Sequence, residues 1–305
     1  MEKKTRNLFS SSSVLFFFIA SMFLSSVSIA QEDEARRLWD SEFLKKRAAV
    51  KTPATKTSAT KTPAAARKTP AYRRATPKSN AVDEQITGEM MGITIWRLRP
   101  SGAADSSDAR LLVQDAGTKD SNEYTPERVE VETVFTIGDR VRLSVESPRD
   151  GYLYVIDREQ YTDGTTSEPY LIFPTLRNNN AVTAGRVIEM PGKSAFLLKP
   201  LRTDYKGELL TLIVTQEPLG EIKPGAAEVK LESRLVEQWE KQWGAPFERF
   251  EMIGGAGKSY TKAEKEAGVE GRLLTQEDEL PQTLYRIVAK PGSPLVIAVP
   301  LRISK

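Results

Sequence analysis

The sequence contains no cysteine and no histidine. Without cysteine, disulfides, thiol nucleophiles and thiolate metal ligands are excluded. Without histidine, the Ser-His triads, the common zinc sites and haem held by histidine are excluded as well. No EF-hand loop is present, so a metal ion would have to bind through carboxylates alone. We therefore predict no cofactor, and we expect little on the protein to titrate near neutral pH.

Long apolar runs are also scarce, and the one that is present lies near the N-terminus. Residues 14–24 read "VLFFFIASMFL" after a short basic start, and the small residues Ser28 and Ala30 precede a cut before Gln31. This order predicts a signal peptide over 1–30, with an uncleaved anchor as the alternative. No cysteine follows the run, which excludes a lipoprotein. We expect a soluble protein that is exported, periplasmic or extracellular, and not transmembrane after cleavage.

Acidic residues are missing from the next segment. Residues 43–82 contain 11 Lys or Arg and no Asp or Glu, whereas residues 83–305 contain 28 basic and 35 acidic side chains. Lys-Thr-Pro recurs from positions 51, 61 and 68, and such a composition predicts a disordered basic linker over 31–83. Only its start, 32–47, has the pattern of a short amphipathic helix.

A basic tail of this kind is typical of nucleic-acid binding, but export argues against that partner, and we predict no nucleic acid. Acidic envelope polymers or lipid headgroups fit better. The alternative is a plain soluble spacer.

From residue 84 onward, short apolar runs alternate with turn signals, without a regular alternation of strands and helices. This predicts a mainly β fold, an antiparallel immunoglobulin-like β-sandwich over 84–305 with an added amphipathic helix. The expected strands cover 92–98, 129–135, 139–147, 152–157, 169–174, 185–190, 195–198, 208–215, 284–289 and 295–301.

The clearest strand is "DRVRLSVES", 139–147, in which Val141, Leu143 and Val145 face one way and polar residues face the other. This alternation predicts a half-buried strand. Asp150-Gly151 then predicts a tight turn, because this pair tolerates the positive φ angles of a hairpin. We expect 152–157 to return as the paired strand.

One stretch has helical spacing. Residues 228–243 place Leu231, Leu235, Val236, Trp239 and Trp243 three and four positions apart, and Gly244 and Pro246 end the pattern. This predicts an amphipathic helix packed on or beside the sandwich. Trp239 and Trp243 are either buried against the sandwich or form a binding face.

A family resemblance rests on the segment "FTIGDRVRLSVESPRDGYLYVIDRE", followed in order by "YLIFPT", "AGRVIEMPG" and "LLTLIVTQEPL". In this order the segments resemble the bacterial domain-of-unknown-function family 4384, over about 135–219. The resemblance implies an exported accessory module with no assigned chemistry and no catalytic residue to transfer. Residues 220–280 fall outside it, and we expect a helical insertion there before closing strands over 283–302. The matching residues are Gly138, Asp139, Asp150, Gly151, Tyr152, Tyr154, Phe173 and Pro174.

Two motifs suggest chemistry that the rest of the sequence does not support. "GGAGKS", 254–259, has Met252 where a phosphate-binding P-loop needs glycine, and a capping box, Thr261 to Glu264, sets the next helix start later. Ser259 and Lys262 fit S-x-x-K, but no partner motif of the penicillin-binding enzymes is present. We predict no nucleotide binding.

Side chains around one turn are candidates for binding. "DREQYTDGTTSEP", 157–169, gathers four carboxylates that could hold a cation weakly, although solvated acidic turns are more common. Tyrosines nearby could form a platform for a glycan or a peptide, or could pack in the core. The candidate binding residues are Tyr152, Tyr154, Tyr161, Tyr170, Trp239 and Trp243.

Together these features predict an exported, non-catalytic interaction module of the bacterial cell envelope. Its sandwich would bind an envelope protein or glycan, and its basic arm would contact acidic polymers or headgroups. One alternative is an exported hydrolase that uses carboxylates or a Ser-Lys pair. Another is a structural or assembly component with one permanent protein partner.

Overall fold

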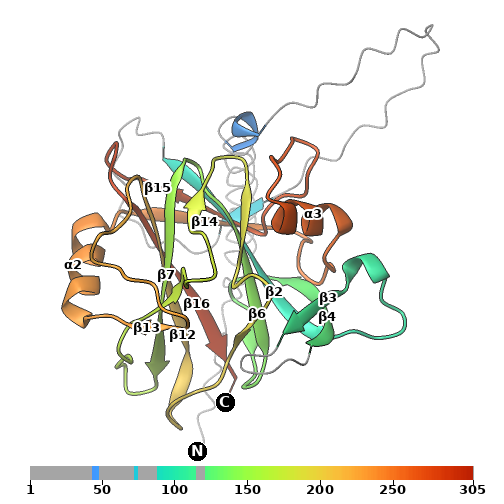
Figure 1. Cartoon of the computed structure of the whole chain (residues 1–305), viewed down its shortest axis with the longest axis horizontal. Coiled ribbons are helices and arrows are strands. Elements are labelled where there is room, and N and C mark those ends of the chain that lie inside the picture. Colours follow the sequence, from blue (N-terminus) through green and yellow to red (C-terminus); the bar gives the residue numbers. More distant parts are fainter. Residues whose placement is uncertain (1–42, 48–71, 75–87, 115–120, 305) are drawn as a thin grey trace, which may run out of the picture.

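The structure of the chain is a computed structural model that describes residues 43–47, 72–74, 88–114 and 121–304 (Figure 1). The predicted signal peptide and most of the predicted linker lie outside these ranges. In the part of the chain that is described, no helix has the length and apolar character needed to cross a membrane.

Strands dominate the described part of the chain, as the pattern of short apolar runs predicts. Within the described ranges there are sixteen strands and two α-helices, α2 (Ser233–Trp243) and α3 (Lys262–Glu270). The strands are β1 (Tyr72–Arg74), β2 (Glu89–Pro100), β3 (Leu111–Gln114), β4 (Ser121–Val129), β5 (Val134–Phe135), β6 (Arg140–Glu146), β7 (Gly151–Tyr161), β8 (Tyr170–Phe173), β9 (Ala181–Val182), β10 (Val187–Met190), β11 (Phe196–Leu197), β12 (Tyr205–Thr215), β13 (Val229–Lys230), β14 (Phe247–Met252), β15 (Thr283–Ile287) and β16 (Leu295–Ile303).

The strands form two sheets. In the nine-stranded sheet the order is β1-β14-β15-β2-β4-β3, while β6 lies along the other edge of β2 and carries β10 and β11. The seven-stranded sheet has the order β13-β8-β7-β12-β16-β5, with β9 beside β7. All pairs are antiparallel except β16 with β5, which is parallel. The mainly β, sandwich-like prediction is therefore confirmed.

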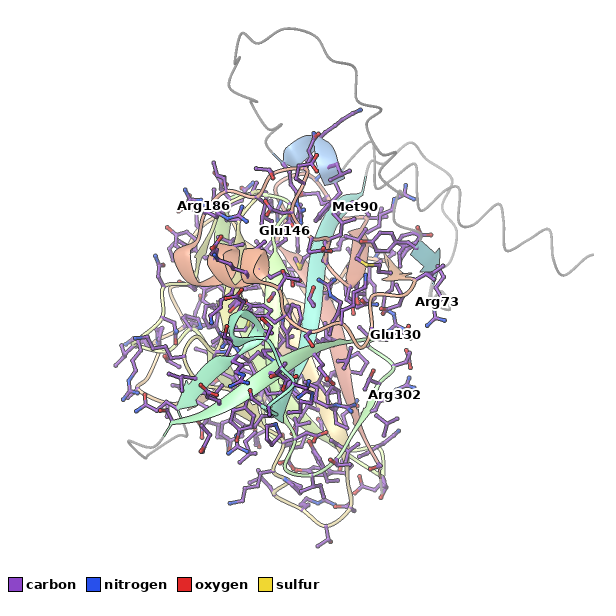
Figure 2. The ribbon with its side chains drawn as sticks, turned by 90° about the vertical axis from the view of Figure 1, so that its right-hand side faces the viewer. Arg73, Met90, Glu130, Glu146, Arg186 and Arg302 are labelled. Carbon is purple, nitrogen blue, oxygen red and sulfur yellow. The ribbon has the colours of Figure 1, made fainter. Side chains whose placement is uncertain are left out.

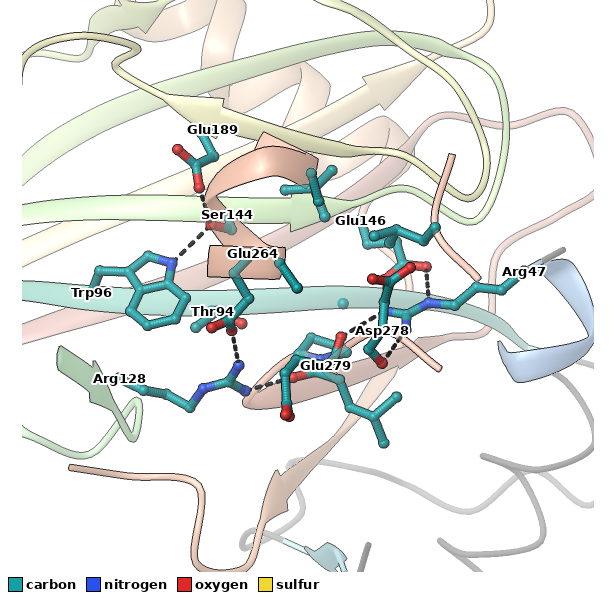
Figure 3. A pocket seen from close by; sticks show the side chains of 17 residues that line it. Arg47, Thr94, Trp96, Arg128, Ser144, Glu146, Glu189, Glu264, Asp278 and Glu279 are labelled. Atoms are coloured by element: carbon teal, nitrogen blue, oxygen red, sulfur yellow. Dashed lines mark hydrogen bonds and ion pairs between the residues drawn. The ribbon is translucent and has the colours of Figure 1, made fainter. Parts of the chain in front are cut away.

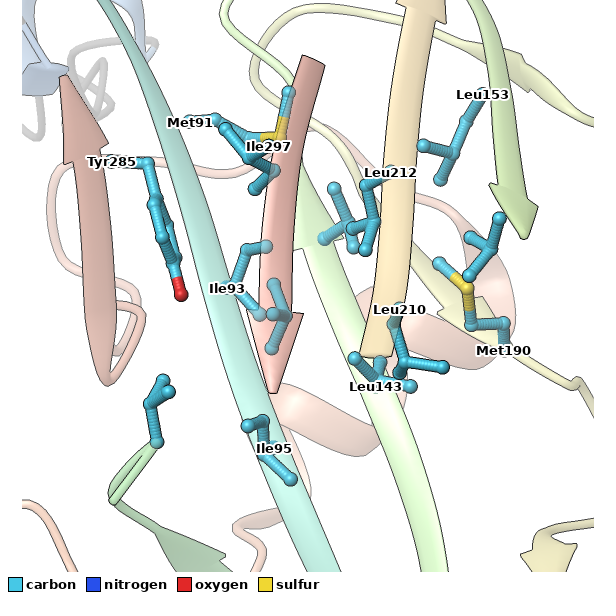
Figure 4. Packing of buried hydrophobic residues seen from close by; sticks show 14 of the residues in the cluster. Met91, Ile93, Ile95, Leu143, Leu153, Met190, Leu210, Leu212, Tyr285 and Ile297 are labelled. Atoms are coloured by element: carbon cyan, nitrogen blue, oxygen red, sulfur yellow. The ribbon is translucent and has the colours of Figure 1, made fainter. Parts of the chain in front are cut away.

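The core lies between the two sheets (Figure 4). Alternate residues of β2 and β6, such as Ile93 and Leu143, meet alternate residues of β7, β12 and β16, such as Leu153, Leu212 and Ile297. All five are at most 1% exposed. The predicted inward direction of Val141, Leu143 and Val145 is confirmed. Burial of alternate apolar side chains from both inner faces is the main force that holds the two sheets together.

The predicted hairpin at Asp150-Gly151 is wrong. β6 pairs with β2, β10 and β11, whereas β7 pairs with β8, β9 and β12, so the turn connects one sheet to the other. Gly151 has a φ of 154°, and a Cβ there would lie 2.1 Å from the carbonyl oxygen of Thr215. Glycine at this position thus lets the connection between β6 and β7, which forms an arch between the two sheets, pass closely over β12.

Two further strand predictions differ from the structure. The expected strand 129–135 is interrupted, because β4 ends at Val129 and β5 covers only Val134–Phe135, with a turn between them. β14 lies inside the stretch that we expected to be helical, between α2 and α3. In β14, Phe250 and Met252 point to the outer face of the nine-stranded sheet while Phe247 packs on the inner core.

α2 covers the outer face of the seven-stranded sheet. It begins at Ser233, five residues later than the periodicity suggested, and Val236 and Trp239 are buried against Tyr154, Ile156 and other residues of that face. Leu235 and Trp243 are partly buried beside them. The predicted amphipathic character of this helix is confirmed.

The outer face of the nine-stranded sheet is covered by α3, by the following loop 271–281 and by two short pieces of the basic tract, the name used from here on for residues 43–82 (Figures 1 and 2). Residues 44–46 form a 3-10 turn above Glu146 and Met90, and β1 adds to the edge of β14. The predicted extended linker is therefore docked on the body at 43–47 and 72–74. Its remaining residues lie outside the described ranges.

Candidate functional site

A pocket opens between the outer face of the nine-stranded sheet and the cover formed by α3 and loop 271–281 (Figure 3). Its empty volume is about 450 Å³, counting the part that is open to solvent. The side chains that line it come from β2, β4, β6 and β10, from the cover and from the docked turn. They include Arg47, Thr94, Trp96, Arg128, Ser144, Glu146, Glu189, Glu264, Leu274, Asp278 and Leu280.

The floor of the pocket is the polar side of β2 and β6. Because side chains alternate along a strand, the inward Val141, Leu143 and Val145 leave Arg142, Ser144 and Glu146 on the outer face. The prediction of a half-buried strand is wrong, because the polar side is covered too: Arg142 is 6% exposed and Glu146 5%. Charged groups at such burial need partners, since desolvation of an isolated charge is very costly.

Arg47 supplies the partner of Glu146. Its Nε donates to Glu146 Oε1 at 2.9 Å and its Nη2 donates to Glu146 Oε2 at 2.6 Å. The guanidinium also donates to the backbone carbonyls of Asp278 and Glu279, at 3.0 and 3.2 Å. Burial raises the pKa of Glu146, and the arginine acts against that rise. A two-pronged contact of this kind uses the planar geometry of arginine, which lysine lacks.

A second ion pair connects the sheet to the first turn of α3. Arg128 on β4 donates to the carboxylate of Glu264 and to the carbonyl of Leu280. Glu264 also accepts from the backbone N–H of Thr261, whose hydroxyl accepts from the Glu264 N–H, so the predicted capping box is confirmed. One arginine thereby positions both the helix start and the end of the cover loop.

A third group surrounds Glu189 on β10. Arg142 donates to this carboxylate at 2.8 Å, and the hydroxyl groups of Ser144 and Tyr260 donate to it as well. The indole N–H of Trp96 donates to Ser144 Oγ at 2.8 Å. Burial is the main cause that raises the pKa of Glu189, and the same cause raises the pKa of Tyr260.

α3 lies very close to this group. A Cβ at Gly268 would come within 2.3 Å of the Glu189 carboxyl, so a glycine is needed for the helix to approach. Each of the three carboxylates, on Glu146, Glu189 and Glu264, has its own arginine. The resulting pocket wall is rich in charge but balanced, and it offers hydrogen-bond donors and acceptors to a polar ligand.

The residues predicted to bind lie away from this pocket. Tyr154 on β7 and Trp239 on α2 are each 3% exposed and pack between the sheet and the helix, and the Trp243 ring stacks on the Trp239 ring with centroids 5.6 Å apart. Tyr152 is partly buried in the same cluster, and Tyr170 is partly exposed on neighbouring β8. The structure brings Tyr152, Tyr154, Trp239 and Trp243 together, on the outer face of the other sheet. Whether these residues bind a ligand stays a prediction.

Tyr161 is separate from that cluster. It lies at the end of β7, 5% exposed, with the guanidinium of Arg202 3.9 Å from its ring centroid. The carboxylates of the nearby turn also diverge, since Asp163 interacts with Arg202 and Thr165 while Glu168 contacts Ser233 and Lys230. Over the described ranges, no group of three or more acidic side chains is arranged to hold a metal ion.

The "GGAGKS" loop is tied to β4. The Gly257 N–H donates to the Arg128 carbonyl, the Arg128 N–H donates to the Lys258 carbonyl, and Ser259 forms a bridge with Glu127. Lys262 is exposed and lies 3.8 Å from Glu266. The loop therefore serves to connect β14 to α3 along the edge of β4.

Sequence reasoning missed the pocket for a definite reason. Alternation within 139–147 identifies two faces but does not say what covers the polar one. Arg47, Glu146, Glu189 and Glu264 come from distant parts of the chain, and the capping box was the one local signal near them. Comparison with family models, with curated proteins and with solved structures finds no match to this chain.

Proposed function

We propose that this chain is an exported, non-catalytic interaction module of the bacterial cell envelope, and that it binds a polypeptide on the outer face of its nine-stranded sheet. We also propose the finer assignments: an immunoglobulin-like sandwich, a cleaved signal peptide and membership of domain-of-unknown-function family 4384. The basic tract would contact acidic envelope polymers or lipid headgroups. The support for that role is the net positive charge of the basic tract, which contrasts with the net negative charge of residues 83–305.

One observation carries the choice of a polypeptide partner. The outer face of the sheet already holds two polypeptide segments, 43–47 and 72–74, and buries Phe43, Arg47 and Tyr72 to 3% exposure or less. β1 adds to the edge of β14 through backbone pairing, which is a common way for sheets to bind extended peptides. A face that accepts side chains and a strand in this manner has the properties of a protein-binding surface.

A glycan fits this face less well. Sugar rings stack on open aromatic faces, but the Arg128 guanidinium lies 5.3 Å from the Trp96 ring centroid. Tyr260 contacts the same indole edge-on at 4.8 Å. The aromatic wall of the pocket is thus committed to internal contacts.

The test is a crosslinking pull-down of the tagged full chain from its own envelope, at low and high salt. Partners bound through the basic tract should dissociate at high salt, because exposed charges are screened. Partners bound on the sheet should remain. Failure to capture any stoichiometric protein in either condition would refute the proposal. A constant one-to-one partner would instead identify an assembly component.

A carboxylate hydrolase is the second candidate, and one pair of residues favours it. Asp157 and Glu208 are interacting carboxyl groups in the end of the sandwich, and burial is the main cause that raises the pKa of both. Two acids with a shared proton are a known catalytic arrangement. Envelope-polymer hydrolysis by the full chain that is lost in both Asp157→Asn and Glu208→Gln would support this candidate over the first.

A further inference from the structure

The docked segment 43–47 occupies a socket with two compartments. In the first, Phe43 packs with Tyr72, Met90, Phe250, Met252, Leu280 and Leu284 on the outer face of the sheet. Gly92 makes room for it, since a Cβ at that position would lie 3.1 Å from Phe43 Cζ and 2.6 Å from Pro281 Cγ. This compartment is apolar and accepts the flat ring of one aromatic side chain.

The second compartment is made of acceptors only. The Glu146 carboxylate and the carbonyls of Asp278 and Glu279 receive four hydrogen bonds from Arg47. The guanidinium also lies 5.5 Å from the Phe43 ring centroid, so the two anchor side chains contact each other. A planar cation with several donors satisfies this compartment, and an ammonium group would leave acceptors unfilled.

Between the anchors, Lys45 is exposed, whereas Leu44 is partly buried against the same apolar cluster. The Gln276 amide donates to the Leu44 carbonyl at 3.3 Å. Phe43 and Arg47, at 3% and 2% exposure, are the two anchors. The pocket continues beyond Arg47 toward Thr94 and Arg128.

We infer that this socket is a recognition site for polypeptide segments that carry an aromatic residue and, four positions later, an arginine, and that residues 43–47 are its occupant within the same chain. The inference rests on the proposed function, because it names the site and the chemistry of the partner. The docked segment then controls access: a partner with the same two anchors must displace it. Charge complementarity to Glu146 and the fit of the ring above Gly92 select such a partner.

The test uses the full chain with Phe43→Ala and Arg47→Ala together, which empties the socket, and a fluorescent peptide "SEFLKKRAA" that copies residues 41–49. Anisotropy should show saturable binding to this variant, roughly a hundredfold tighter than to the wild type, whose socket is occupied. The Lys45→Ala protein is the matched control and should behave as the wild type. A peptide with lysine in place of the arginine, or alanine in place of the phenylalanine, should bind at least about tenfold more weakly.

Adding Glu146→Gln to the emptied variant should reduce the difference between the arginine and lysine peptides, because only the Asp278 and Glu279 carbonyls then favour the guanidinium. If the emptied variant does not fold, a photo-crosslinking version of the peptide, used in excess on the wild type, should label the residues around Glu146. A wild-type dimer that the peptide dissociates would show that a second copy supplies the segment, which supports the same site.

A folded, emptied variant that ignores the peptide, or that binds all three peptides equally, would overturn the inference. Envelope partners that are still captured in that case would leave the proposed function standing. The two proposals can therefore fail independently.

Discussion

Glu159 on β7 and Glu208 on β12 are direct cross-strand partners, and both point into the end of the sandwich with 6% and 7% exposure. Asp157 lies on the same side of β7 and its carboxylate is repelled by those of Glu208 and Glu159, while the Tyr205 hydroxyl donates to Glu208 and the Leu201 N–H donates to Glu159. Like charges opposite each other destabilise a sheet. The arrangement is therefore most stable when a proton neutralises part of it.

Stability should consequently decrease as pH rises toward neutrality. The pKa of Glu208 is raised to about 7, mainly by burial and further by Glu159, and burial also raises the pKa of Glu251 to about 7. The prediction that little titrates near neutrality is therefore wrong. Between the unfolded pKa of about 4.3 and this folded value, the folded chain binds protons that the unfolded chain does not. The resulting stabilisation is fully present below the pKa of the unfolded chain, and it is lost as the pH rises through the folded value of about 7.

Urea unfolding at pH 5 and pH 8 measures this effect. We expect the free energy of unfolding to be about 2 kcal/mol larger at pH 5. Glu208→Gln should reduce the difference, because its amide needs no proton, whereas the exposed Glu221→Gln should leave it unchanged. A free energy of unfolding that is larger at pH 8 would contradict the assignment.

The arch between the sheets should be intolerant of any side chain at position 151. Gly151→Ala places a Cβ against the Thr215 carbonyl at 2.1 Å and should cost about 3 kcal/mol or more. Gly164→Ala is the matched control, because Gly164 also has a positive φ, 86°, but has no atom within 4 Å of the added Cβ. It should cost about 1 kcal/mol. Equal losses in chemical denaturation would mean that the close approach has no energetic role.

Trp239→Ala should separate packing from binding on α2. The side chain of Trp239 is buried between α2 and the seven-stranded sheet, so its removal should cost about 3–5 kcal/mol of unfolding free energy, measured in guanidinium chloride. Trp243 is only partly buried, and Trp243→Ala should cost clearly less. If Trp243→Ala keeps its stability but loses a captured envelope partner, the predicted binding role of this cluster gains support. Retained capture argues against it.

Glu146→Gln should release the docked turn without unfolding the sandwich. The substitution removes the charge that holds Arg47, and a docked segment with two anchors can leave where a core strand cannot. Trypsin cleavage after Arg47, followed by mass spectrometry, should accelerate at least about tenfold. Glu168→Gln is the control, since Glu168 forms an exposed ion pair with Lys230. An unchanged cleavage rate would show that the ion pair does not hold the turn.

Much of the fold was accessible from local patterns. Alternation predicted the inward face of 139–147, helical spacing predicted the apolar side of α2, and the capping box located the start of α3. These features depend on residues a few positions apart, so a linear sequence contains them. β14 was missed because its alternation is weak and helix-like stretches lie on both sides.

The partners across the molecule were not accessible in this way. The Asp-Gly turn at 150–151 has the same local chemistry whether it closes a hairpin or crosses between sheets, and only the pairing of β6 with β2 and of β7 with β12 decides between them. Arg47 and Glu146 lie 99 positions apart, in a basic tract and on the polar side of a strand. Nothing near either residue signals the other.

The sequence by itself determined the β-rich sandwich, its amphipathic helix and the separation of a basic tract from an acidic body, because periodicity and composition express those properties directly. The tertiary structure alone decided which polar faces are buried. Burial of a strand's polar side depends on what covers it, and here the cover comes from α3, from loop 271–281 and from residues 43–47. The pocket, its three arginine-carboxylate pairs and the socket for Phe43 and Arg47 exist because those distant segments meet on one sheet.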